Sequence, residues 1–167
     1  AGLRGNSQID MSSDVNALVI CIGNDLVADD GVGHVVYDEL IRRGLPEGTR
    51  LKLLGLGGMA LLGELSGEDL LIVVDAVQFG VSPGTVHVLN WDDLPEGGSH
   101  VSCHGIGIRE AIEVSRKLYP EKTPAAVSLV GIEGKCFDQL GKGLTSDVAA
   151  SIPSAVETVL EILNDKR

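Results

Sequence analysis

The residues of this sequence best suited to chemistry are three aspartates and one histidine. Asp29 and Asp30 follow a first apolar run, and Asp75 closes a second apolar run. His104 lies in a glycine-rich stretch before an amphipathic segment. Ligands of open parallel sheets bind beyond the carboxyl ends of the strands, where all four residues are expected. Carboxylates with one imidazole suit a divalent ion such as manganese, zinc or nickel, and do not choose among them.

Each of these side chains also has a purely structural explanation. Capping of the following helix would account for Asp29 or Asp30, at about 1 kcal/mol, but not for both. Asp75 could form a strand-end turn, although a carboxylate beside a buried strand needs a partner for its charge. His104 could be a hydrogen-bonded loop residue, but the glycines one and three positions after it would let the backbone approach a bound group.

Other chemical motifs are weak or absent from the sequence. His100 and His104 are four residues apart, but they lack the glutamate of an HExxH zinc helix. Cys103 is adjacent to His104 and therefore cannot easily form a thiol–imidazole pair with it. The three cysteines form no close pair, and Cys21 fits a buried strand. The stretch 23–28 after the first apolar run lacks the further glycines that cradle a pyrophosphate, which disfavours nucleotide binding.

Length and composition predict one compact domain. The chain has 167 residues, of which 44% are hydrophobic and 22% are charged. Its net charge of −11 opposes binding to nucleic acid or to an anionic membrane. Because no apolar run reaches the roughly 18 residues of a membrane span, we expect a cytoplasmic protein. Residues 1–14 are expected to be an added or disordered extension, and residues 15–167 a single α/β domain.

Hydrophobic periodicity predicts strands that alternate with helices, which is typical of an α/β fold. The run 70–74 is apolar at every position, as in a central strand covered on both faces. These features favour a parallel sheet. Pro153 fits the last helix only near its first turn. Strands are expected at 17–22, 50–56, 70–74, 85–89 and 126–130, and helices at about 31–43, 59–65, 108–118 and 152–163.

Five motifs of this chain, in order, resemble those of the maturation endopeptidases of nickel-iron hydrogenases. The family's first loop, Gly-Asn-x-Leu-x-x-Asp-Asp/Glu-x-x-Gly, matches residues 23–33. The later motifs are Asp-Ala at 75–76, Ser-x-His-x-x-Gly at 102–107, Gly-Ile-Glu at 131–133 and Gly-Leu-Thr at 143–145, where the family has Gly-Leu-Ser. Chance agreement at so many positions in the right order is improbable.

The resemblance implies a fold and a set of site residues. The fold is a three-layer α/β/α sandwich of the phosphorylase/hydrolase-like class. Its five-stranded mixed sheet has the order 2-1-3-5-4 with strand 4 antiparallel, which modifies the parallel sheet expected above. Matched position by position, the catalytic and metal-contacting trio is Asp30, Asp75 and His104. Asn24 and Asp29 would shape the first loop, and Asp29 would serve the turn or the helix start.

The resemblance also implies an activity. A protease would remove a short C-terminal extension from the nickel-loaded large-subunit precursor of a nickel-iron hydrogenase. Because the sequence has no coiled-coil pattern or exposed apolar stripe that would demand association, we expect this protease to be a monomer. The precursor would supply the nickel, for which another divalent ion could substitute. One alternative is a non-catalytic nickel-checking chaperone of hydrogenase assembly. Another is a small phosphorylase or hydrolase on the same fold, which would need an anion-binding cluster, but basic residues are scarce around the motifs.

Overall fold

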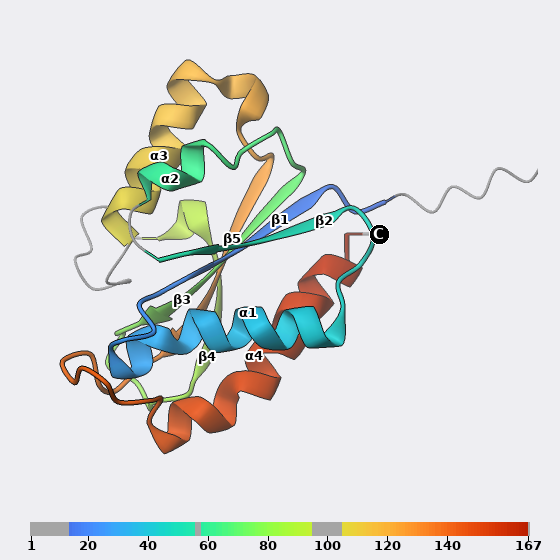
Figure 1. Ribbon diagram of the computed structural model, residues 1–167. Helices are drawn as coiled ribbons and strands as arrows, with labels where there is room; N and C mark the ends of the chain where they lie inside the picture. The colour runs from blue at the N-terminus through green and yellow to red at the C-terminus, as the bar shows by residue number, and fades with distance from the viewer. Residues whose placement is uncertain (1–13, 56–57, 95–104, 167) are drawn as a thin grey trace, which may run out of the picture.

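A five-stranded mixed sheet lies between two layers of helices (Figure 1). The computed structural model describes residues 14–55, 58–94 and 105–166. The strand order β2-β1-β3-β5-β4 confirms the order that the resemblance implied. The strands are β1 (Ala17–Ile22), β2 (Thr49–Leu54), β3 (Leu70–Val77), β4 (Val86–Asn90) and β5 (Ala126–Glu133).

The parallel sheet expected from composition is wrong at β4, which pairs antiparallel with β5. β4 follows β3 after a loop of residues 78–85, which is too short for the crossover that a parallel strand needs. β1 is parallel to β2 and β3, and β3 is parallel to β5. The sheet is therefore mixed, with β2 and β4 at its edges.

Helices cover both faces of the sheet, as the all-apolar strand predicts. In Figure 1, α1 and α4 lie on one side of the strands, and α2 and α3 lie on the other. The α-helices are α1 (Val32–Arg43), α2 (Met59–Leu62), α3 (Gly105–Leu118) and α4 (Ser146–Asn164). Short 3-10 helices occupy η1 (Ala28–Gly31), η2 (Trp91–Asp93) and η3 (Pro120–Lys122).

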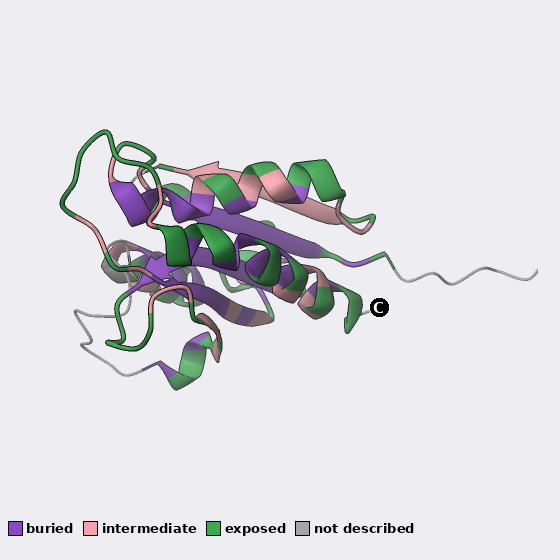
Figure 2. Ribbon diagram, turned by 90° about the horizontal axis from the view of Figure 1, so that it is seen from below, coloured by how far each residue is buried: buried purple, intermediate pink, exposed green. Residues whose placement is uncertain are grey.

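Alternation along the strands builds two separate cores. Val19 of β1 and Ile72 of β3 face α1 and α4, whereas Ile20 and Val73 face α2 and α3. Every residue of β1 and β3 is buried, as Figure 2 shows for the central strands. The two strands that precede the candidate carboxylates are thus held in the middle of the sandwich.

Strand β3 is longer than its apolar run suggests. It continues to Val77, so Asp75 lies inside the strand rather than after its end. β5 pairs with β3 as far as Val77, while the pairing of β1 with β3 stops at Val74. Asp75 therefore follows the end of the β1–β3 ladder although the strand itself continues beside β5.

The expected position of Pro153 in the first helical turn is wrong. Helix α4 begins at Ser146, and Pro153 lies in its interior. An interior proline costs about 3 kcal/mol because it removes a hydrogen bond and clashes with the preceding turn. A long apolar stripe, which includes the fully buried Val156 and Val159, packs α4 onto the sheet and offsets that cost.

Nearly all of the expected extension, residues 1–14, falls outside the described residues. In the ranges that the structure describes, the helices lack the combination of length and apolar character that a bilayer crossing requires.

Candidate active site

The carboxyl ends of β1, β3 and β5 point to the same edge of the sheet, at the left of Figure 1. The loops 23–27, 78–85 and 134–145 leave the strands at this edge. β2 lies on one side of β1 and β3 on the other, so the winding of the chain reverses between β1 and β3. Ligands of open α/β sheets bind at such a point.

Two glycines of the first motif allow a close approach of backbones at this edge. A Cβ atom at Gly23 would lie 2.2 Å from the carbonyl oxygen of Asp30, and one at Gly33 would lie 2.1 Å from that of Ile22. Any side chain at either position would therefore displace the backbone. The glycines of the motif thus let the first loop fold back onto the end of β1.

Asn24 shapes this loop, in agreement with the role expected for it. Its Oδ1 accepts a hydrogen bond from the backbone N–H of Leu26 at 3.0 Å, and its own N–H donates to the carbonyl of Asp30 at 3.1 Å. His34, in α1, adds a support that the motif did not suggest, because its Nε2 donates to the carbonyl of Gly23 at 3.0 Å. The loop is therefore held from both of its ends.

Asp30 lies in η1 and is 7% exposed. Its backbone N–H donates to the carbonyl of Val27 at 2.9 Å. Helix η1 contacts β3, the strand that carries Asp75. The residue at the capping position of α1 is Gly31, which has no side chain to accept a hydrogen bond, so neither aspartate of the motif occupies that position.

Asp29 is completely buried, and its carboxylate binds a distant loop rather than its own helix. Oδ2 accepts the backbone N–H groups of Lys135 and Cys136, each at 2.9 Å. Oδ1 accepts the backbone N–H of Thr145 at 2.7 Å, and the Thr145 hydroxyl lies 3.0 Å from both carboxylate oxygens. Asp29 does shape a loop, as expected, but the loop that it orders is 134–145.

Asp75 is also completely buried. Its Oδ1 accepts the backbone N–H of Ala76 at 2.8 Å. Strand alternation places it on the face of Val73 and Val77, which α2 and α3 cover. Burial and, secondarily, the charge of Asp75 raise the pKa of the Cys21 thiol, so Cys21 stays protonated. Its position in buried strand β1 is the one that the sequence indicated.

His104, the third member of the expected trio, lies outside the described residues, as do His100 and Cys103. Helix α3 begins at the next residue, Gly105, and covers the face of the sheet that carries Asp75. In the described part of the chain, no three His, Cys, Asp or Glu side chains gather into a group that could hold a metal ion. The trio therefore stays a prediction.

Sequence reasoning missed the buried anchor formed by Glu133, which is 2% exposed. Its carboxylate accepts the backbone N–H groups of Phe79, Gly80 and Val81 at 2.8 to 3.3 Å. The Nε2 atom of His87 lies 3.3 Å from the same carboxylate. Glu133 thereby orders the loop that follows β3. An ionisable residue at the end of a mostly apolar strand was the signal in the sequence.

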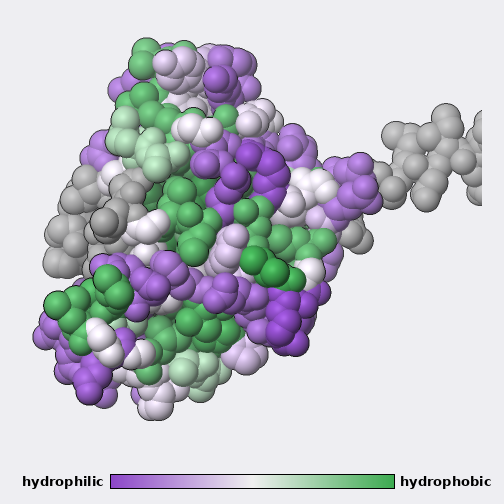
Figure 3. Space-filling view, in the orientation of Figure 1, coloured by the Kyte–Doolittle hydropathy of each residue, from purple (hydrophilic) through white to green (hydrophobic). Residues whose placement is uncertain are grey.

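Two loops of this edge join and expose apolar side chains. Val27 forms an antiparallel bridge with Leu140, and the N–H of Gly141 donates to the carbonyl of Leu26 at 2.9 Å. Leu26 and Leu140 are 63% and 77% exposed. Figure 3 shows hydrophobic groups at the left margin of the molecule, where these loops lie in Figure 1.

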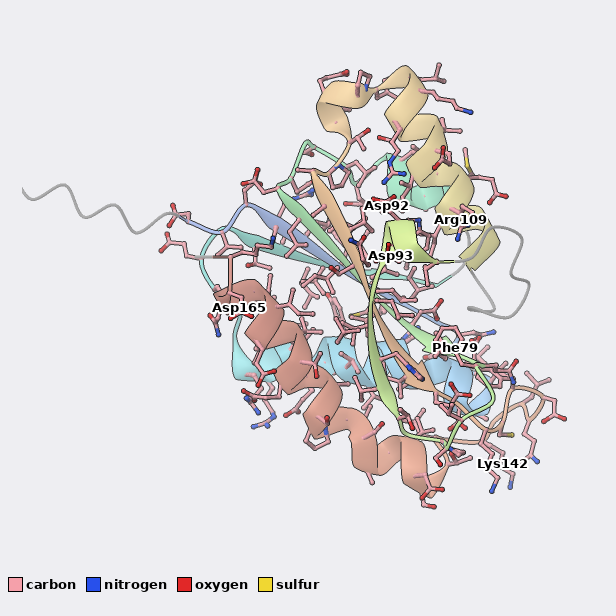
Figure 4. The ribbon with its side chains drawn as sticks, turned by 180° about the vertical axis from the view of Figure 1, so that it is seen from behind. Phe79, Asp92, Asp93, Arg109, Lys142 and Asp165 are labelled. Carbon is pink, nitrogen blue, oxygen red and sulfur yellow. The ribbon has the colours of Figure 1, made fainter. Side chains whose placement is uncertain are left out.

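Figure 4 shows the same end of the sheet from the opposite side. Figure 4 shows Phe79, Lys142 and Arg109 on one side of the molecule, at the right. Phe79 and Lys142 belong to loops that leave β3 and β5, and Arg109 belongs to α3. Together with the fold, the buried carboxylates and the accessible rim define a three-layer α/β protein with a candidate site at the carboxyl ends of its parallel strands.

Comparisons with known proteins place the chain within that class. A family model described as hydrogenase maturation protease matches residues 36–162. The hydrogenase expression/formation protein HoxM of Azotobacter vinelandii is 30% identical over 154 residues, which cover 90% of this chain and 73% of HoxM. The chain belongs to the hydrogenase maturation protease family, and it is an endopeptidase.

Solved structures agree with this assignment. The structure of the hydrogenase maturating endopeptidase HybD from E. coli matches with a TM-score of 0.80 and 30% identity, over 90% of this chain and 93% of that one. The [NiFe] hydrogenase maturation protease HybD from Thermococcus kodakarensis matches with a TM-score of 0.73 and 25% identity, over 89% of this chain and 99% of that one. The family model begins at residue 36 and therefore does not include the first loop.

Proposed function

We propose that this endopeptidase removes a short C-terminal extension from the nickel-loaded large-subunit precursor of a nickel-iron hydrogenase. Asp30, Asp75 and His104 would contact nickel that the precursor already holds. The observation that carries the proposal is the burial of two carboxylates, Asp30 and Asp75, on elements that contact each other at the carboxyl edge of the sheet.

The electrostatics of this edge support a cationic ligand. Asp30 and Asp75 are 7% and 0% exposed, and the chain carries a net charge of −11. Water screens buried carboxylates poorly, so a divalent cation beside them is attracted more strongly than at the protein surface. Oxygen ligands with one imidazole are a donor set that nickel, zinc and manganese accept.

Nickel in this proposal is part of the substrate. The precursor's own ligands would hold the ion, and the trio would complete its coordination and anchor the scissile bond at the edge of the sheet. Hydrolysis adds one water across the peptide bond, with the hydroxyl on the carbonyl carbon and the proton on the leaving amine. A divalent ion can promote that step by polarising the carbonyl or by lowering the pKa of a bound water.

Incubation of the purified protein with nickel-loaded precursor, followed by mass spectrometry of the released peptide, tests the proposal. Cleavage is expected with the loaded precursor and not with the same precursor stripped of nickel. Equal cleavage of both would overturn the nickel requirement. Binding without cleavage would favour the non-catalytic nickel-checking chaperone, against which the endopeptidase family assignment argues.

The proposal includes a cytoplasmic monomer that acts on the precursor. Cys21 and Cys136 are free thiols, as is usual in the reducing cytoplasm. Fractionation of the producing cells and light scattering of the purified protein test the compartment and the oligomeric state. A periplasmic location or a stable dimer would contradict this part of the proposal.

A further inference from the structure

We propose that Asp29 is a positioning residue, which fixes the catalytic geometry of Asp30 by anchoring η1 to loop 134–145. The functional consequence rests on the proposed role of Asp30. The structural claim is independent of that role, because it concerns only the position of η1 in the molecule. Two independent features of the described residues lead to this inference: a strained turn before Asp29, and the set of hydrogen bonds that its carboxylate accepts.

The strained residue is Ala28, which precedes the pair of aspartates. Its φ is 36°, and it is the one non-glycine residue with positive φ in the described ranges. L-residues avoid this conformation because Cβ crowds the backbone, and it persists only where surrounding contacts enforce it. Ala28 is 2% exposed, so solvent does not accommodate the turn. Contacts of the residues next to Ala28 must therefore stabilise this backbone conformation.

The hydrogen bonds of Asp29 stabilise this conformation. Besides the bonds that its carboxylate accepts from Lys135, Cys136 and Thr145, its own N–H donates to the carbonyl of Cys136 at 3.0 Å. These bonds tie Asp29 to segments that lie more than 100 residues further along the chain. The anchor is thus fixed by the packing of β5 and α4, not by the first loop itself.

The surroundings of the residue 29 side chain suit an aspartate in both size and hydrogen bonding. A Cβ atom at position 134 would lie 3.3 Å from Cβ of Asp29 and 2.3 Å from the Phe137 ring, so Gly134 leaves the room that loop 134–145 needs to close over the carboxylate. Both carboxylate oxygens accept backbone N–H groups. An asparagine offers only one oxygen and would turn an N–H donor toward another N–H.

Asp30 follows Asp29 directly, so any movement of the anchor reaches it within one peptide unit. Its backbone is held by the N–H of Asn24 and the carbonyl of Val27, both within the same short loop. Those local bonds move with η1, whereas the bonds of Asp29 attach η1 to the rest of the molecule. A misplacement of about 1 Å can cost on the order of 100-fold in rate.

Asp29→Ala, assayed with the nickel-loaded precursor, is the first test. We expect kcat to fall by roughly 100-fold with KM changed much less, since the binding surface is retained. Adding Ala28→Gly to this variant should recover part of kcat, because glycine adopts positive φ without steric cost. Thr145→Ser keeps both the hydroxyl and the N–H and serves as the matched control. An unchanged kcat in a folded Asp29→Ala variant would overturn the proposal.

A second variant covers the case in which Asp29→Ala does not fold. Thr145→Ala removes one hydroxyl from the anchor and keeps the backbone N–H, so we expect a smaller loss of kcat, about tenfold, at unchanged KM. The same activity as Thr145→Ser would count against the inference.

An NMR comparison separates this inference from the proposed function. We expect the backbone amide shifts of Asp30 to change in Thr145→Ala but not in Thr145→Ser, and residue 145 is too far from Asp30 along the chain to affect these shifts as a sequence neighbour. Unchanged Asp30 shifts in folded protein would refute the positioning role, whatever the assay shows. If the wild-type protein does not cleave the nickel-loaded precursor while these shifts move as expected, the proposed function fails and the structural role of Asp29 stands.

Discussion

The carboxylate of Glu133, at the end of β5, accepts a hydrogen bond from the backbone N–H of Gly80 at 2.8 Å. This contact joins the last position of one central strand to the loop that follows its neighbour β3. The same carboxylate also accepts the backbone N–H groups of Phe79 and Val81, so one side chain orders three consecutive residues of loop 78–85. Asp75 lies on β3 shortly before that loop.

Glu133→Ala should therefore destabilise the protein by about 1 to 3 kcal/mol, because loss of the carboxylate leaves several part-buried backbone N–H groups without their acceptor. Glu133→Gln keeps one acceptor oxygen and should cost less. Chemical denaturation measures both values. Glu47→Ala, at an exposed position, is the control and should change stability by no more than about 0.5 kcal/mol. A loss for Glu133→Ala no larger than for the control would contradict the anchor role.

Asp30→Asn and Asp75→Asn should keep the fold and lose cleavage of the nickel-loaded precursor. Each change removes one charge from a buried carboxylate at nearly constant volume. Loss of a residue that merely supports a metal ligand costs about 10- to 100-fold, so loss of a ligand should cost at least about 100-fold. Peptide release and thermal unfolding are the measurements.

His104→Ala should likewise keep the fold and lose cleavage of the nickel-loaded precursor. Asp138→Asn, an acidic residue of loop 134–145 outside the trio, is the control and should leave cleavage nearly unchanged. Retained cleavage by Asp30→Asn or Asp75→Asn would remove that residue from the trio.

Pro153→Ala should raise the stability of the protein. The alanine N–H can donate to the carbonyl of the preceding turn, which proline cannot do, and Pro153 is exposed, so no core contact is lost. We expect a gain of about 1 kcal/mol, less than the full cost of an interior proline because proline also restricts the unfolded chain. Urea denaturation measures the gain, with Ser154→Ala, the neighbouring exposed position, as control. A decrease in stability would show that α4 depends on the proline geometry.

Cys21 should make stability depend on alkaline pH. Burial raises the pKa of its thiol in the folded state, so above the unfolded value of about 8.5 the folded protein retains a proton that the unfolded chain releases. The contribution of Cys21 is complete below that pH and is lost as pH rises from it toward the folded value. Between pH 8.5 and 10 the free energy of unfolding should fall, at up to about 1.4 kcal/mol per pH unit.

Urea denaturation of the wild type and of Cys21→Ala across that range isolates the effect. The variant is less stable overall because of the cavity it creates, but its pH dependence should be shallower. Parallel curves would show that the thiol does not titrate differently in the two states.

Much of the fold could be predicted from local pattern. The all-apolar runs of β1 and β3 determined two central buried strands, and the spacing of Val156, Val159 and Leu163 determined the last helix. The limits of β3 could not be found in this way. Asp75 interrupts the apolar run, and only pairing with β5 carries the strand on to Val77. The antiparallel direction of β4 followed from the family motifs and not from periodicity, which is the same for both directions.

The sequence by itself predicted which residues form the candidate site, because the motif carries Asp29 and Asp30 side by side and Asp75 follows the apolar run of a second strand. Only the tertiary structure decided what Asp29 does. Its partners, Lys135, Cys136 and Thr145, lie more than 100 residues away along the chain. A buried carboxylate takes the N–H groups that folding brings within about 3 Å of it, and that proximity is set by packing of the sheet and helices rather than by neighbours in sequence.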